Sequence, residues 1–135
     1  MSDRKLLYRA VIPVRWGDMD SYGHVNNSIY MQYIEEARVA WFEQVGVVMN
    51  NVPKGPVVLQ IQHTFLKPVV HPATACVELF AGALGRSSMV LEHRLTTLEQ
   101  PDVVYGEGNC KIVWIDHQAG RSVPLPEFLR NAFAD

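Results

Sequence analysis

The hydrophobic positions between residues 27 and 45 recur every three or four residues, which predicts a single long amphipathic helix. The apolar side of this helix comprises Tyr30, Tyr33, Ile34, Ala37, Trp41 and Val45. An asparagine or serine favours the start of a helix, and a glycine favours its end. We therefore expect the helix to be capped by Asn26, Asn27 or Ser28 and to end at Gly46.

Elsewhere hydrophobic and polar residues alternate, which is typical of strands with one buried face. This pattern predicts one strand before the helix, at residues 6–14, and four after it, at residues 57–65, 73–81, 88–97 and 103–115. Because no helix separates the four later strands, we expect them to form an antiparallel meander with the long helix covering one face. A short helix that ends near residue 133 is expected to close the chain.

Several strand positions carry side chains that bear on packing. Gly106, Gly108 and Cys110 share one face of the last strand, and their small size predicts that the long helix approaches closely there. His63 lies on the apolar face of the strand at residues 57–65, where a histidine is either a core residue or part of a pocket wall. Cys76 and Cys110 lack Cys-x-x-Cys spacing, so we expect both to be reduced core residues.

The composition indicates one ordinary globular domain over residues 1–135, with 48% hydrophobic and 19% charged residues. A net charge of −2 gives no electrostatic case for nucleic-acid binding. The sequence contains no apolar run of membrane-spanning length, and its first residues do not resemble a signal peptide. We therefore expect a cytoplasmic protein with neither a membrane nor a nucleic-acid partner.

The candidate chemistry lies in residues 15–27, which read Arg-Trp-Gly-Asp-Met-Asp-Ser-Tyr-Gly-His-Val-Asn-Asn. They place Asp18 and Asp20 at the end of a strand and lead through a glycine turn into the long helix. The start of a helix carries free backbone N–H groups and a partial positive charge. Such groups can polarise a carbonyl oxygen while a carboxylate attacks the carbonyl carbon or activates water. This stretch therefore indicates catalysis on a carbonyl group.

This stretch, followed by Tyr30, Tyr33, Glu35 and Ala37-Arg38, resembles the signature of acyl-CoA thioesterases of the 4-hydroxybenzoyl-CoA thioesterase type. The resemblance extends to residues 113–116, 120–121 and 124–126, so it covers nearly the whole chain. It implies the hotdog fold, which is an α+β fold with an antiparallel sheet of about five strands wrapped around one long central helix. It also implies hydrolysis of acyl-CoA thioesters to a free carboxylic acid and coenzyme A, without a cofactor.

The resemblance also implies roles for individual residues. Asp20 would carry the chemistry, as a nucleophile or as a general base. The backbone N–H of Asn27 would polarise the thioester carbonyl. Arg86, in the turn at residues 82–88, would contact the phosphates of coenzyme A, and part of that site could come from a second subunit.

Two other residues of the loop keep alternative interpretations. Asp18 is the better candidate for capping the helix, which is a structural task. His24 can orient the loop by hydrogen bonds, contact the substrate, or join the aspartates in a metal site or a general-acid pair. We expect no metal, because thiolate is a good leaving group and the sequence offers no further Cys/His cluster.

Two other functions fit the motif less well. Hotdog hydratases and dehydratases carry a Gly-Asp-x-Asn-Pro run with a following His, whereas residues 17–21 begin with Gly-Asp and lack the Asn-Pro. A non-catalytic acyl-CoA or acyl-carrier binding module would lack an acid at position 20.

Because one helix leaves the sheet edges unpaired, we expect a homodimer, or a tetramer built from two dimers, with sites between subunits.

Overall fold

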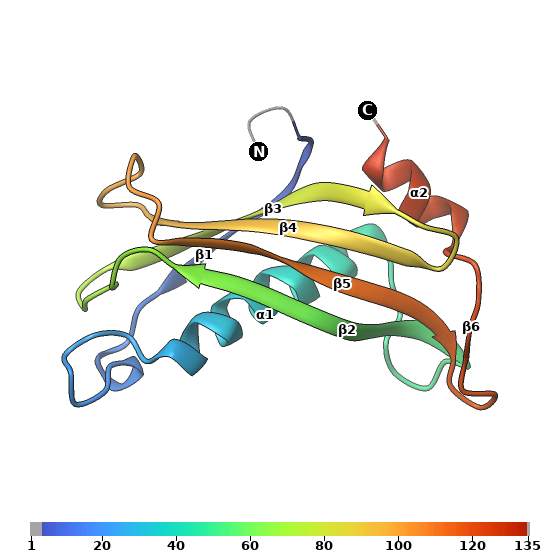
Figure 1. The fold of residues 1–135 in the computed structure, drawn as a ribbon, viewed down its shortest axis with the longest axis horizontal. Coiled ribbons are helices and arrows are strands. Elements are labelled where there is room, and N and C mark those ends of the chain that lie inside the picture. Colours follow the sequence, from blue (N-terminus) through green and yellow to red (C-terminus); the bar gives the residue numbers. More distant parts are fainter. Residues whose placement is uncertain (1–3, 135) are drawn as a thin grey trace.

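A computed structural model describes residues 4–134, in which an antiparallel sheet curves around one long helix (Figure 1). Its elements are β1 (Leu6–Pro13), the one-turn helix η1 (Trp16–Asp18), α1 (Asn27–Val45), β2 (Lys54–Phe65), β3 (Thr74–Leu84), β4 (Ser88–Thr97), β5 (Gly106–Asp116), β6 (Arg121–Ser122) and α2 (Glu127–Phe133). The five expected strands are present, and the two-residue strand β6 is added to them. This is the hotdog arrangement, so the predicted fold class is confirmed.

The order of the strands contradicts the predicted meander. The strands lie in the order β1-β3-β4-β5-β2, so β2 pairs with β5 at one edge of the sheet and does not pair with β3. The prediction was wrong because alternation identifies a strand and its buried face but not its neighbour. Residues 66–73 carry the chain from β2 to β3, and Val69 holds this link against the start of α1. Its N–H donates to the hydroxyl of Tyr30 (2.9 Å), and its carbonyl accepts from the N–H of Val25 (2.9 Å).

Helix α1 starts and ends where the sequence indicated. The side chain of Asn26 caps it by accepting a hydrogen bond from the N–H of Ser28 (2.9 Å). Gly46 ends it with a φ of 91°, a left-handed conformation that glycine adopts without strain. The helix packs mainly against β1 and β3, and much of β2 stays exposed. The helix therefore covers one part of the sheet and leaves the β2 edge open.

The glycines of β5 accommodate β2 and not the long helix, so the expectation for these two positions was wrong. A Cβ atom on Gly106 would lie 2.5 Å from Nε2 of His63, and one on Gly108 would lie 1.9 Å from the backbone oxygen of Gln62. Both contacts come from the neighbouring strand. Only Cys110, further along β5, is approached from the helix, by the guanidinium of Arg38 (3.9 Å to Sγ).

The remaining general expectations concern the cysteines and membrane segments. Both cysteines, which lie within the described residues, are free and buried, as predicted. Burial raises the pKa of the Cys110 thiol. Of the helices within residues 4–134, none has both the length and the apolar character needed to cross a membrane.

Candidate active site

The loop between β1 and α1 is built around the buried carboxylate of Asp18. This carboxylate accepts hydrogen bonds from the backbone N–H of Arg15 (3.0 Å), from Nε of Arg15 (3.2 Å) and from the hydroxyl of Tyr33 (2.6 Å). Burial by itself would raise the pKa of Asp18, but the bonds from Tyr33 and Arg15 outweigh it and lower that pKa. The backbone oxygen of Asp18 also accepts from the N–H of Asn26 (2.9 Å), so Asp18 fixes the loop to the helix start.

Asp20 lies beyond this buried anchor and faces a cavity. Its Oδ1 accepts from the backbone N–H of Tyr22 (2.9 Å), and its Oδ2 accepts from the side-chain Nδ2 of Asn26 (3.1 Å). Its own N–H donates to the backbone oxygen of His24 (2.9 Å). Both carboxylate oxygens are thus held, and each keeps room for a further partner. The side chain is only partly buried, so a substrate or water can reach it.

Asn27 offers the free donor expected at the start of α1. The N–H of Ser28 is taken by Oδ1 of Asn26, and the N–H of Ile29 is taken by the backbone oxygen of Asn26 (2.9 Å each). No hydrogen bond joins the N–H of Asn27 to any residue among 4–134. An unpaired N–H at a helix start carries part of the positive end of the helix dipole. It is therefore suited to stabilise negative charge on an oxygen.

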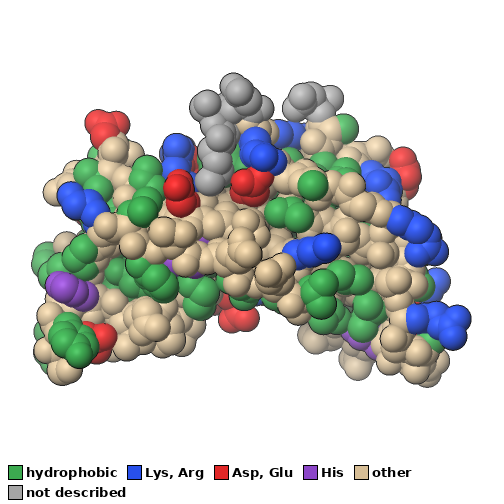
Figure 2. Space-filling view, viewed as in Figure 1, with side chains coloured by type: hydrophobic (Ala, Val, Ile, Leu, Met, Phe, Trp, Pro, Cys, Tyr) green, Lys and Arg blue, Asp and Glu red, His purple; other side chains and the backbone are tan. Residues whose placement is uncertain are grey.

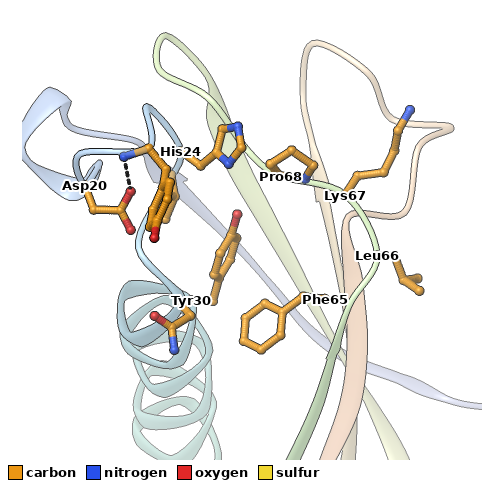
Figure 3. Close-up of a pocket in the computed structure, with 10 residues that line it drawn as sticks. Asp20, His24, Tyr30, Phe65, Leu66, Lys67 and Pro68 are labelled. Carbon is orange, nitrogen blue, oxygen red and sulfur yellow. Dashed lines mark hydrogen bonds between the residues drawn. The ribbon is translucent and has the colours of Figure 1, made fainter.

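A cavity of about 400 Å³ brings these groups together with an apolar wall (Figure 3). It is lined by Asp20, Tyr22, His24, Val25, Asn27, Tyr30, Phe65, Leu66, Lys67 and Pro68. Tyr30 and Phe65 meet edge to face, with ring centroids 5.4 Å apart. Burial raises the pKa of Tyr30, and its hydroxyl accepts from Val69, which leaves the hydroxyl proton available to a ligand. Such a mixture of apolar walls and few polar groups is typical of small-molecule sites.

His24 and Lys67 lie at the rim of this cavity. The ring of His24 makes no hydrogen bond with Asp20 or with any other described residue. Lys67 is the second residue after the end of β2, and its ammonium group extends away from the cavity (Figure 3). Sequence reasoning missed Lys67, and also missed the pocket role of Phe65. The only signal was their place at the end of a strand, because a polar loop and a distant strand end meet only after folding.

His63 lies behind the aromatic wall and is paired with a second histidine that sequence reasoning missed. Its Nδ1 lies 2.8 Å from Nε2 of His93, and its ring stacks against Tyr30 with centroids 6.1 Å apart. Burial lowers the pKa of His93 to about 3, and the nearby His63 and Arg38 add to this effect. Burial also lowers the pKa of His63. Both rings are therefore neutral in the fold; His93 is fully buried in the core, and His63 is half-buried beside the cavity wall.

Arg86 is not near this cavity within one subunit. The turn that holds it joins β3 to β4, and Ser88 pairs with Val113 of β5, whereas Phe65 at the cavity pairs with Gly106. Seven residues of β5 separate the two places, which corresponds to roughly 23 Å. Lys and Arg side chains gather at this end of the molecule, on the right in Figure 2. Arg130 supports the turn by donating to the backbone oxygens of Gly85 (2.7 Å) and Arg86 (2.9 Å).

A metal site would need more ligands than this loop supplies. Within residues 4–134, no group of three or more His, Cys, Asp or Glu side chains converges in a way that could hold an ion. Asp20 and His24 are close in sequence and line the same cavity, but they have no third ligand beside them in this part of the chain.

Comparison with known proteins identifies the family. The model of the thioesterase-like superfamily matches residues 14–133, so the chain belongs to that superfamily. This membership confirms the family and the enzyme class that the sequence indicated. The matched range includes both the loop with Asp20 and the whole sheet from β2 onward.

Solved structures of similar proteins agree with this assignment. The chain is 65% identical to the PA2801 protein of Pseudomonas aeruginosa, provisionally named a thioesterase, with a TM-score of 0.93 over 96% of this chain and 100% of that one. It is 46% identical to a protein of Xanthomonas campestris provisionally named an acyl-CoA thioesterase, with a TM-score of 0.76 over 83% and 95%. It is 29% identical to a thioesterase of Thermus thermophilus complexed with coenzyme A and zinc, with a TM-score of 0.78 over 95% and 92%.

Proposed function

We propose that the protein hydrolyses acyl-CoA thioesters to a free carboxylic acid and coenzyme A, as an enzyme of the 4-hydroxybenzoyl-CoA thioesterase type. The observation that carries the proposal is that one cavity is lined both by Asp20 and by Asn27, whose N–H has no partner among residues 4–134. The apolar wall with Tyr30 and Phe65 suits an acyl group. The similarity to the Xanthomonas and Thermus proteins, named for acyl-CoA and found with coenzyme A, supports coenzyme A as the carrier.

In this mechanism the thioester carbonyl lies between Asp20 and the start of α1. Its oxygen points to the N–H of Asn27, which stabilises the negative charge that develops there. Asp20 acts either as a nucleophile, giving an anhydride that water then hydrolyses, or as a base that takes a proton from the attacking water. In both versions the C–S bond breaks, and coenzyme A leaves as a thiolate that is then protonated. His24 contributes its backbone oxygen, which accepts from the N–H of Asp20, and in this mechanism its ring transfers no proton.

The contacts of His24 favour hydrolysis over the hydratase alternative. A hydratase needs a carboxylate and a histidine that exchange a proton with the substrate as a pair. No hydrogen bond joins the His24 ring to Asp20 or to another of residues 4–134. The carboxylate is instead bonded to Tyr22 and Asn26, which are neutral donors. A non-catalytic binding module would have no use for a carboxylate held in this way.

The test of the function is release of free thiol from a panel of short-chain, long-chain and aromatic acyl-CoAs. We expect turnover with at least one member of the panel, and loss of that turnover in Asp20→Asn. The exposed residue Asp102 provides a matched control, because Asp102→Asn removes a carboxylate that does not line the cavity. A wild-type protein that binds acyl-CoA but releases no thiol from any of them would leave the binding module as the better description.

The proposed active unit is a homodimer, or a tetramer of two dimers, joined through the β2 edge. This strand runs over twelve residues at the edge of the sheet. It and the residue after it expose the apolar side chains Val57, Val58, Leu59, Ile61, Phe65 and Leu66. In Figure 1, β2 forms the lower edge of the sheet. A long edge with apolar side chains favours pairing with another strand. A second copy paired antiparallel through β2 would satisfy this edge.

Such a dimer would also explain the remote position of Arg86. Antiparallel pairing sets the Phe65 end of one β2 against the Lys54 end of the other. The β3–β4 turn lies at the Lys54 end, since both Lys54 and Ser88 pair with the last part of β5. The Arg86 of a second copy would therefore approach the Asp20 cavity of the first, where it can contact a phosphate of coenzyme A.

Light scattering at micromolar concentration tests this assembly. We expect the wild type to be at least a dimer, and we expect Leu59→Asp to be monomeric and inactive, because it puts a charge at the most exposed apolar position of β2. Leu98→Asp is the matched control, since Leu98 is similarly exposed (51% against 63%) but lies outside β2. A wild-type monomer with full activity would contradict the proposal.

A further inference from the structure

We propose that Asn26 is a positioning residue of the reaction, because its side-chain amide holds the carboxylate of Asp20 in register with the free N–H of Asn27. The inference rests on the proposed function, in which Asp20 and Asn27 act on the same carbonyl group. It adds to that function the residue that connects the two and keeps them aligned.

One amide group makes both connections. Nδ2 of Asn26 donates to Oδ2 of Asp20 (3.1 Å). Oδ1 of the same amide accepts from the backbone N–H of Ser28 (2.9 Å) and from the hydroxyl of Ser28 (2.6 Å). The amide therefore touches the carboxylate on one side and the first turn of α1 on the other.

The neighbours of the amide decide which way it points. A backbone N–H can only donate, so the atom facing Ser28 must be the oxygen. A carboxylate oxygen can only accept, so the atom facing Asp20 must be the nitrogen. The reverse orientation would place oxygen against oxygen and N–H against N–H. The donor to Asp20 is thus fixed by the network, and in this orientation the Ser28 hydroxyl also donates to Oδ1.

The two bonds to Asp20 do different work. The bond from the N–H of Tyr22 is local to the loop, two residues along the chain, so it moves with the loop. The bond from Asn26 comes from the residue that caps α1, directly before the free N–H of Asn27. Only this second bond ties the carboxylate to the helix that carries the proposed oxyanion donor. A displacement of about 1 Å between such groups is enough to slow an enzyme strongly.

Asn26 also leaves Asn27 as the available donor. Its Oδ1 takes the N–H of Ser28, and its backbone oxygen takes the N–H of Ile29. The N–H of Asn27 lies just before these and has no partner among residues 4–134. Asn26 thus accepts from the N–H groups of Ser28 and Ile29 and leaves the N–H of Asn27 without a partner among residues 4–134. The same residue holds the carboxylate of Asp20.

Substitutions that keep the helix cap separate positioning from stability. Ser caps a helix about as well as Asn, so Asn26→Ser should melt within roughly 3 °C of the wild type. Asn26→Ser removes the donor to Asp20, and we expect kcat to fall roughly tenfold with little change in KM. Asn26→Asp also adds a like charge beside Asp20, so kcat should fall further. In that variant the acid side of the pH–activity profile should move to higher pH by about one unit or more.

A double-mutant cycle then asks whether Asn26 acts through Asp20. In an Asp20→Asn background, the further change Asn26→Ser should lower the residual rate less than about twofold, because the group it positions is already gone. Equal losses in both backgrounds would show that Asn26 acts only on the structure of the loop, and the inference would be wrong. Wild-type kcat in Asn26→Ser, with an unchanged melting temperature, would overturn it as well.

These outcomes remain separate from the fate of the proposed function. If the wild type releases no thiol from any acyl-CoA, the function fails before Asn26 is tested. If Asp20→Asn is inactive while Asn26→Ser and Asn26→Asp keep full activity, only the positioning role fails. If both positions matter and their effects are not additive, the carboxylate and the amide work as one unit.

Discussion

Asp18 and Asp20 lie two residues apart in one loop, but their surroundings differ in almost every respect. Asp18 is 3% exposed and accepts three hydrogen bonds from Arg15 and Tyr33. Asp20 is partly exposed, accepts one bond on each oxygen, and lines a cavity with Asn27. A carboxylate saturated with donors has no capacity left for a substrate. The comparison shows that Asp18 holds the loop together, and it supports the proposal that Asp20 is the reactive carboxylate.

The largest effect we expect is that of Asp20→Asn on turnover. The change keeps the shape of the side chain and removes the anion, so kcat should fall by about two orders of magnitude or more. The melting temperature should change little, because the side chain is not a buried anchor. Stopped assays of thiol release, together with a thermal melt, check both statements. If Asp18→Asn reduced kcat more than Asp20→Asn at a temperature where both are folded, the comparison would be reversed.

Asp18→Asn should act on stability. An amide NH₂ group would replace one carboxylate oxygen and face N–H or O–H donors from Arg15 or Tyr33, which leaves a donor at this buried position without an acceptor. We expect a loss of about 2–3 kcal/mol in the free energy of unfolding, or roughly 10 °C in melting temperature. Urea unfolding measures the loss, and Asp102→Asn should leave the midpoint unchanged. A fully stable Asp18→Asn protein would remove the anchor role.

Lowering the pH should reduce the stability of the folded protein through His93. This effect is independent of the role proposed for Asp20. The pKa of His93 is about 3 in the fold, against 6.5 for an ordinary histidine, so between these values the unfolded chain binds a proton that the folded chain does not. Its contribution to stability is complete above pH 6.5 and is lost as pH falls toward 3. Between about pH 7 and pH 5 the loss should be about 2 kcal/mol.

Urea midpoints at the two pH values measure this effect, and the variant His93→Gln isolates it. Glutamine keeps a polar partner for His63 but does not titrate, so its loss of stability between about pH 7 and pH 5 should be smaller than that of the wild type by about the same amount. An equal loss in both proteins would mean that His93 is not the group responsible.

The smallest effect is expected for Arg86, which should act on binding and on neither stability nor the chemical step. Arg86→Ala should raise KM for acyl-CoA several-fold with little change in kcat, since a phosphate contact is equally strong in the ground and transition states. The effect should shrink as salt rises and vanish for an acyl thioester without the nucleotide. Lys111→Ala, which removes a cation from β5, serves as control. Equal sensitivity of both substrates would show that Arg86 acts through structure.

How far the sequence predicts this molecule depends on the range of the interactions involved. The helix, its Asn26 cap and its Gly46 end follow from local preferences, and they were predicted correctly. A structural task for Asp18 was expected, but as the helix cap; Asn26 is the cap, and Asp18 instead holds the loop through Arg15 and Tyr33. The position of β2 next to β5 was not, since it depends on how residues 66–73 cross the molecule.

The missed parts of the site have the same origin. Phe65 and Lys67 meet Asp20 only because β2 ends beside the start of α1. His93 meets His63 across β5, where both pair with Gly108, and no spacing in the sequence connects them. The two glycines were noticed, but they were assigned to the helix because the neighbour of β5 was unknown. A wrong strand order therefore led to a wrong partner for each of them.

The attachment of Val69 has a consequence for motion. Two hydrogen bonds, to Tyr30 and Val25, hold the link of residues 66–73 against the helix start, and this link continues directly from the cavity wall at Phe65. If the link detached, one side of the cavity would open while the strand pairs of the sheet stayed intact. The amide protons of Val25 and Val69 should then exchange with solvent together, and faster than those in the middle of β4. Substrate entry could follow this local opening and would not require the domain to unfold.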